Sequence, residues 1–145
     1  MSATHILLVE DADDIARAYM AWLWSAGTYV LASATTLAEA RTQLQQWDAQ
    51  GIHCALILLD LNLPDSMGLA GIVNLRQFVR EISDGDHPVP IIVLTGVVEE
   101  VLRQEVLSWG IKDYRVKALC SMSMLRDIVL EVLEKHGDTD PPPDA

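Results

Sequence analysis

The chain has 145 residues, a length typical of a single domain. Half of its residues are hydrophobic, enough to bury a sizeable core, and this excludes wholesale disorder. Its 10 Lys and Arg stand against 21 Asp and Glu, and the net charge of −11 disfavours direct binding to nucleic acid or to anionic lipid.

The cysteines and the apolar runs indicate where the protein works. Cys54 and Cys120 lack CxxC spacing and have apolar neighbours, which predicts free thiols in a reducing compartment rather than a disulfide framework or a zinc site. The first apolar run begins at Ile6, and no run approaches the roughly 18 residues that span a bilayer. We therefore expect a cytoplasmic protein without membrane insertion.

Short apolar runs alternate with amphipathic stretches along the chain. The apolar runs predict five β-strands, and the stretches between them carry apolar residues at helical spacing. The predicted strands are Ile6–Val9, Tyr29–Ala32, Cys54–Leu59, Ile91–Leu94 and Ile111–Val116. The predicted helices carry apolar residues from Ile15 to Ala26, Leu37 to Trp47, Leu69 to Ile82, Val98 to Trp109 and Leu125 to Leu133.

Capping and turn residues support these boundaries. Gly27 stands where the C-cap of the first helix is expected, and either Thr35 or Thr36 can cap the second helix. Residues 137–145 contain three successive prolines and are predicted to form an extended tail or a linker. The folded domain is accordingly expected to span residues 1–136.

Five β-then-α units predict an α/β fold built on a parallel sheet, because parallel neighbours need crossover connections. The third and fourth predicted strands are apolar on both sides of the pleat, as strands covered by helices on both faces require. The sequence thus predicts a (βα)5 doubly wound domain. In such folds the ligand site lies at the carboxyl ends of the strands.

Polar side chains follow four of the predicted strands. The first strand leads into Glu10 and Asp11, the third into Asp60, the fourth into Thr95 and the fifth into Lys117. Three adjacent carboxylates repel one another, so either their pKa values rise or a cation lies among them, and Mg²⁺ suits such a donor set. A phosphoryl group would complete the site, with its oxygens on Mg²⁺, Lys117 and Thr95 while Asp60 serves as nucleophile.

Each of these residues also has an ordinary structural interpretation. Acidic residues after strands are often caps or turn residues, a Thr at a strand end is often a packing residue, and a Lys is usually a solvated charge. Their joint occurrence in one layer of strand ends favours a functional site.

Four stretches of the chain resemble the response-regulator receiver domain, the CheY-like module of two-component signalling. They are His5–Asp11, Leu56–Gly68, Ile91–Gly96 and Gly110–Lys117, and the resemblance covers residues 4 to about 136. It implies a flavodoxin-like strand order 2-1-3-4-5. It also implies a domain that takes a phosphoryl group from a sensor histidine kinase or a histidine phosphotransfer protein and then switches the binding of a downstream protein target. Such a domain is not an enzyme, because it catalyses only its own phosphoryl transfer and dephosphorylation.

The resemblance assigns a metal site. It makes Asp60 the phosphoacceptor and a Mg²⁺ ligand, Asp11 a direct Mg²⁺ ligand and Glu10 a ligand through water. The backbone carbonyl of Asn62 would be a further ligand.

The resemblance also assigns a switch. Thr95 and Lys117 would hold the phosphoryl oxygens, and Tyr114 matches an aromatic position that moves inward when Thr95 is drawn to the phosphate. Two residues depart from the family pattern. Ala118 replaces a proline that often has a cis bond, and Arg115 replaces an apolar residue, which predicts an exposed cation near the fifth strand.

Two other functions fit parts of the pattern. Haloacid-dehalogenase-type phosphatases also use a strand-end Asp, a Thr or Ser, a Lys and Mg²⁺, but their DxD motif supplies a general acid/base where this chain has Asn62. A receiver-like module could also bind partners without being phosphorylated. The carboxylates, the Thr and the Lys together favour the phosphoacceptor interpretation over both.

Overall fold

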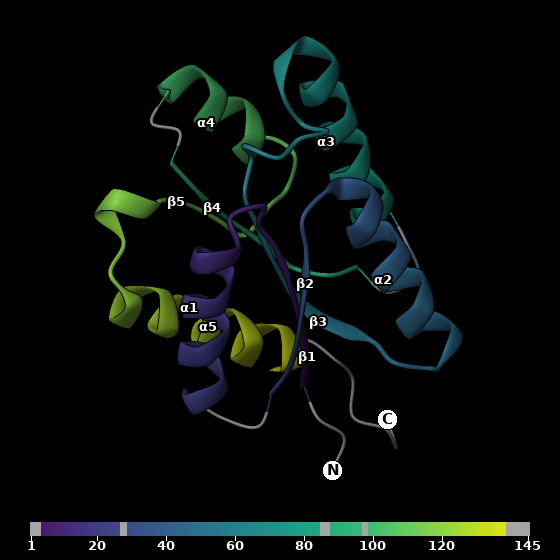
Figure 1. Ribbon diagram of the computed structural model, residues 1–145, viewed down its shortest axis with the longest axis vertical. Coiled ribbons are helices and arrows are strands. Elements are labelled where there is room, and N and C mark those ends of the chain that lie inside the picture. Colours follow the sequence, from purple (N-terminus) through teal and green to yellow (C-terminus); the bar gives the residue numbers. More distant parts are fainter. Residues whose placement is uncertain (1–3, 27–28, 85–87, 97–98, 139–145) are drawn as a thin grey trace.

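The computed structural model describes residues 4–26, 29–84, 88–96 and 99–138. Its centre is a five-stranded parallel sheet (Figure 1) in the order β2-β1-β3-β4-β5, which confirms the predicted α/β fold and strand order. The strands are β1 (Thr4–Val9), β2 (Tyr29–Ala34), β3 (Cys54–Leu59), β4 (Ile91–Thr95) and β5 (Asp113–Val116).

Helices cover both faces of this sheet. They are α1 (Asp13–Ala26), α2 (Leu37–Ala49), α3 (Gly68–Ser83), α4 (Glu100–Leu107) and α5 (Met122–Asp138), with a short 3-10 turn at Lys117–Leu119. Helices α1 and α5 lie on one side of the sheet, whereas α2, α3 and α4 lie on the other (Figure 1). The layers are those of a doubly wound domain.

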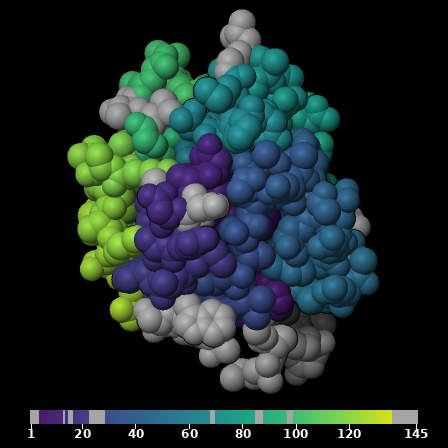
Figure 2. Space-filling model, in the orientation of Figure 1, coloured from purple at the N-terminus to yellow at the C-terminus, as the bar shows by residue number. Residues whose placement is uncertain are grey.

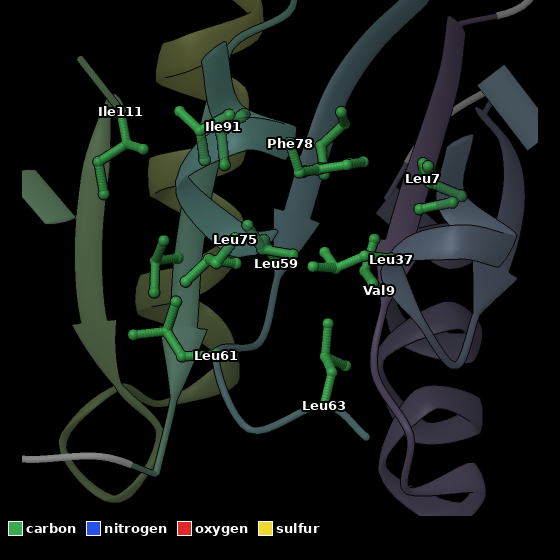
Figure 3. Close-up of a cluster of buried hydrophobic side chains, with 14 of the residues drawn as sticks. Leu7, Val9, Leu37, Leu59, Leu61, Leu63, Leu75, Phe78, Ile91 and Ile111 are labelled. Atoms are coloured by element: carbon green, nitrogen blue, oxygen red, sulfur yellow. The ribbon is translucent and has the colours of Figure 1, made fainter. Parts of the chain in front are cut away.

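Alternation along the strands builds two apolar cores. Successive strand residues point to opposite faces, so Leu7, Ile57 and Val93 face α2, α3 and α4, and their chain neighbours face α1 and α5. Figure 3 shows the larger core, in which Phe78 of α3 and Leu37 of α2 pack against β1 and β3. The central strands are apolar on both faces, as the sequence predicted, and this burial fixes the register that brings the strand ends together.

Several predicted boundaries differ from the structure. Strand β5 begins at Asp113 rather than Ile111, although Ile111 is buried in the core just before it. Helix α4 ends at Leu107, two residues before Trp109, because the chain turns through Gly110 at a φ of 90°. Helix α5 runs to Asp138, two residues into the predicted tail. Gly27, Val98 and residues 139–145 lie outside the described residues.

The amino end of α2 is held by side chains from two parts of the chain. Thr36 is the N-cap, and its side chain accepts a hydrogen bond from the Glu39 amide at 3.0 Å. Asp65, from the loop between β3 and α3, accepts from the amides of Leu37 and Ala38 at 2.9 and 3.1 Å. This carboxylate ties that loop to α2 across 28 residues of sequence.

The structure also describes both cysteines and the hydropathy of the helices. Cys54 is buried and Cys120 is partly exposed, and both are free thiols. In the parts of the chain that the structure describes, every helix falls short of the length and apolar character that crossing a membrane requires.

Gly71 lies in α3 where this helix meets the loop before it. Its amide donates to the carbonyl of Met67 at 3.1 Å, and a Cβ atom on this residue would overlap the backbone of Ser66. The missing side chain therefore lets α3 approach the β3–α3 loop, residues 60–67.

We expect Gly71→Ala to lower the free energy of unfolding by about 1–3 kcal/mol, because the added methyl must displace backbone in a packed region. Without the close approach, replacing a helix-interior glycine by alanine would raise the free energy of unfolding by about 0.5–1 kcal/mol. A fall therefore indicates the close approach. Urea unfolding measures it. The control is Gly96→Ala, where an added Cβ would meet no atom within 4 Å. Equal stability of the two variants would contradict the close approach.

Candidate functional site

Three carboxylates meet at the carboxyl edge of the sheet. Glu10 and Asp11 follow β1 and Asp60 follows β3, and one oxygen from each lies within 4.8 Å of the others. Glu10 and Asp60 are only 3% and 5% exposed, while Asp11 is open to solvent. In Figure 2 the purple atoms of the β1–α1 region reach the surface beside the teal atoms around α3. The structure thus assembles the predicted acidic cluster with one open side.

Lys117 supplies the positive charge of the site. Its Nζ donates to Glu10 Oε2 at 2.6 Å and to Asp60 Oδ2 at 3.1 Å. The lysine directly follows β5, and β4 separates this strand from β3, so the long side chain spans the intervening strand end. One ammonium against three carboxylates leaves the cluster with an excess of negative charge.

Burial and the neighbouring charges set the protonation of the cluster. Burial raises the pKa of Glu10, the negative charge of Asp60 raises it further, and the hydrogen bond from Lys117 only partly opposes both. Burial alone would lower the pKa of Lys117, but its hydrogen bonds to Glu10 and Asp60 raise it above the ordinary value. Lys117 is therefore charged at neutral pH, and the negative charge of Glu10 is disfavoured.

The Asp60 carboxylate is held at both oxygens. Oδ2 accepts from Lys117, and Oδ1 accepts from the backbone amide of Asn62 at 3.1 Å. The Asp60 amide donates to the carbonyl of Val9 at 3.0 Å, which extends the β1–β3 pairing to the end of the strands. These contacts fix the position of the carboxylate relative to Lys117 and the open side of the cluster.

Thr95 and Tyr114 lie on one face of the sheet. Thr95 ends β4 and is fully buried, and Tyr114 of β5 is in register with Val93, two residues before Thr95. The Tyr114 side chain is 5% exposed and belongs to the larger core, where burial raises its pKa. The ring is therefore buried on the same face of the sheet as Thr95, and its movement on phosphorylation stays a prediction.

The two departures from the family pattern have clear structural outcomes. In the described part of the chain no peptide bond is cis, and Lys117–Leu119 forms a 3-10 turn that contains Ala118. The Arg115 side chain is 41% exposed, which confirms the predicted exposed cation, but its Nε also donates to Asp113 Oδ2 at 3.1 Å. Arg115 thus offers a partly neutralised charge beside β5.

Sequence reasoning missed the residues that hold the β3–α3 loop. The Ser66 hydroxyl bonds to the backbone of Leu61 and Leu63, and the Asp65 carboxylate caps α2. Both roles depend on contacts that periodicity does not reveal. The sequence did offer one indication of these roles: Asp and Ser side chains in a loop after a strand commonly bond to nearby backbone.

The donor set suits a hard divalent cation. Glu10, Asp11 and Asp60 offer only carboxylate oxygens, and the exposed side of Asp11 leaves room for water ligands. Mg²⁺ usually takes one or two carboxylates and keeps several waters. The excess negative charge gives such an ion a further electrostatic gain.

Comparison with known proteins identifies the family. The sequence model of one protein family, the response regulator receiver domain, matches residues 6–129. The chain belongs to this family. It is 32% identical over 142 residues to the KDP operon transcriptional regulatory protein KdpE of Escherichia coli (strain K12), a match that covers 96% of the chain and 55% of KdpE. The receiver domain therefore spans about half the length of this relative.

Two solved structures extend the likeness. The phosphorylated cyanobacterial phytochrome response regulator RcpA is 26% identical, with a TM-score of 0.70 over 98% of this chain and 99% of RcpA. The Mn²⁺-bound form of the response regulator Rcp1 is 25% identical, with a TM-score of 0.65 over 97% of this chain and 99% of Rcp1. The receiver domain thus resembles one protein crystallised in a phosphorylated form and another crystallised with a divalent cation.

The raised pKa of Glu10 predicts a pH dependence of stability in the absence of divalent ions. The folded receiver domain holds this proton more tightly than the unfolded chain does, so Glu10 makes the free energy of unfolding fall as pH rises from about 4.5 through the raised pKa. Glu10→Gln lacks this fall. In EDTA we expect the variant to be more stable than wild type at pH 7, with the difference vanishing below pH 4.5.

Urea unfolding at several pH values measures this difference. The control is Glu131→Gln on the exposed face of α5, where the hydrogen bond from Lys135 lowers the carboxyl pKa and predicts the opposite sign. A wild type that is more stable than Glu10→Gln at pH 7 in EDTA would contradict the raised pKa of Glu10.

Proposed function

We propose that the receiver domain accepts a phosphoryl group on the Asp60 carboxylate in a Mg²⁺-dependent reaction and thereby switches the binding of a protein partner. The observation that carries the proposal is the double contact of Lys117 with Asp60 and Glu10 at a buried, excessively negative cluster. Family membership and the phosphorylated form of RcpA support it.

The proposed step is an in-line displacement on a phosphohistidine. An Asp60 carboxylate oxygen forms a bond to phosphorus while the P–N bond to the donor imidazole breaks, and the bonding electron pair leaves with the imidazole nitrogen. The product is an acyl phosphate. Thr95 ends β4 and Lys117 follows the neighbouring β5, and both would take phosphoryl oxygens. The Asn62 amide donates to the Asp60 carboxylate and would steady it.

A bound Mg²⁺ would neutralise phosphoryl charge. Asp11 and Asp60 would hold it directly, Glu10 through water and Asn62 through its backbone carbonyl. The Mn²⁺-bound form of Rcp1 supports a divalent cation in this family. Lys117 would then exchange part of its contact with the carboxylates for contact with the phosphoryl group.

The partners follow from this chemistry. A sensor histidine kinase or a histidine phosphotransfer protein would supply the phosphoryl group, and a downstream protein would bind the surface around Tyr114, α4 and α5. We infer a cytoplasmic location, because free thiols suit a reducing compartment. We also infer a signalling role rather than an enzymatic one, because the domain would transform only its own carboxylate. The net charge of −11 disfavours nucleic acid as the direct target of this domain.

Phosphorylation should require Asp60. With Mg²⁺ and amidophosphate or acetyl phosphate, we expect the intact mass of wild type to rise by one phosphoryl group and that of Asp60→Asn to stay unchanged. Asp48→Asn, an exposed site on α2, serves as the matched control and should be labelled like wild type. Equal labelling of Asp60→Asn and wild type would exclude this acceptor.

Mg²⁺ binding should depend more on Asp11 than on Glu10, since direct coordination contributes more than contact through water. We expect Asp11→Ala to raise the Kd of Mg²⁺ by about tenfold or more, equivalent to about 1.4 kcal/mol. Glu10→Gln should raise it less. Isothermal titration calorimetry measures both, with the exposed neighbour Asp14→Ala as control. An unchanged Kd in Asp11→Ala would refute the ligand assignment.

A further inference from the structure

The hydroxyl of Ser66 bonds back to the middle of the β3–α3 loop. Ser66 is 6% exposed, and its Oγ donates to the carbonyl of Leu61 at 2.5 Å and accepts from the amide of Leu63 at 3.0 Å. These two groups belong to the peptide units on either side of Asn62. One buried hydroxyl therefore bonds to both peptide planes that meet at the Asn62 Cα.

Because each peptide unit is planar, a hydrogen bond to one of its groups also fixes the direction of the other group. In a trans peptide the N–H and the C=O point in opposite directions. The Leu63 amide shares its plane with the Asn62 carbonyl, so an N–H aimed at Ser66 Oγ directs that carbonyl away from Ser66. The oxygen therefore points away from the Ser66 hydroxyl, and Asn62 itself is exposed.

The peptide unit between Leu61 and Asn62 connects Ser66 to the Asp60 carboxylate. The Leu61 carbonyl accepts from Ser66, and the Asn62 amide in the same plane donates to Asp60 Oδ1 at 3.1 Å. A chain of hydrogen bonds thus runs from the Ser66 hydroxyl through one peptide unit to the Asp60 carboxylate. Such chains polarise their members and strengthen one another.

The packing of α3 keeps Ser66 in place. Gly71 has no side chain, which lets the helix contact the Ser66 backbone, and the Ser66 amide donates to the Leu63 carbonyl at 3.1 Å. The neighbouring Asp65 is anchored to α2. These contacts fix the backbone of Ser66 and so fix the position of its hydroxyl.

We propose that Ser66 is a positioning residue that orients the Asn62 carbonyl toward the metal and the Asp60 carboxylate toward the phosphoryl donor. This inference rests on the proposed function, because it concerns the same metal and acceptor. It predicts that loss of the hydroxyl weakens metal binding even when the domain stays folded.

The test compares the Kd of Mg²⁺ in wild type, Ser66→Ala, Ser66→Thr and Ser108→Ala. Ser66→Ala should raise the Kd by about fivefold, the equivalent of one ordinary hydrogen bond. Ser66→Thr keeps the hydroxyl and should restore most of the affinity. Ser108→Ala removes a comparable hydroxyl-to-carbonyl bond at the end of α4 and should leave the Kd unchanged.

Hydrogen exchange of the Leu63 amide gives a second readout that needs no metal. Its protection should fall in Ser66→Ala relative to the amides of α3 and should be kept in Ser66→Thr. If Ser66→Ala does not fold, Ser66→Cys carries the same comparison, because a thiol is a weaker partner than a hydroxyl for both bonds. Folding is checked by thermal melting of each variant.

The outcomes separate the inference from the proposed function. Wild-type affinity in Ser66→Ala, with wild type itself binding Mg²⁺, would overturn the role of Ser66 and leave the proposed function intact. Absence of Mg²⁺ binding by wild type would instead overturn the proposed function. A raised Kd in Ser66→Ala that Ser66→Thr restores would support the positioning role.

Discussion

Repulsion among three carboxylates, opposed by one lysine, is the constraint on which this receiver domain depends. Glu10 and Asp60 are buried within a few ångströms of each other and of Asp11, and only Lys117 bonds to them with a full positive charge among the described residues. Burial is the largest cause of the raised pKa of Glu10, and the contacts with Lys117 do not offset burial and the Asp60 charge together. The site therefore favours whatever brings further positive charge, and the cation in turn favours a phosphoryl group.

The fold provides the rigid frame that this arrangement requires. Strands β1 and β3 are adjacent and buried on both faces, so Glu10 and Asp60 emerge side by side from a closely packed core. Carboxylates on mobile loops would separate and become solvated, and the repulsion would relax. The β3–α3 loop follows the same principle, since Asp65, Ser66 and Gly71 fix it against α2 and α3. Packing in the rest of the fold thus holds the carboxylates together against their mutual repulsion.

Much of this organisation could be predicted from sequence because it follows from simple periodicities. Apolar runs such as Cys54–Leu59 gave a strand with the observed bounds, and the topology of parallel sheets then placed Asp60 beside Glu10. The bonding of Ser66 and the packing of Gly71 were not predictable, because they depend on backbone geometry between residues of different elements. The burial of Tyr114 in the core likewise depends on side-chain packing. The roles of the site residues in phosphoryl transfer stay predictions.

The most direct measurement is a high-resolution crystal structure of the receiver domain with Mg²⁺ and beryllofluoride, a mimic of the phosphoryl group. We expect beryllofluoride on an Asp60 oxygen, the metal against Asp11, Asp60 and the Asn62 carbonyl, and Lys117 Nζ moved from Glu10 to a fluorine atom. Crystals in which Asp60 carries no beryllofluoride at saturating concentration, and Lys117 still bonds to both Glu10 and Asp60, would contradict the central role of this charge cluster.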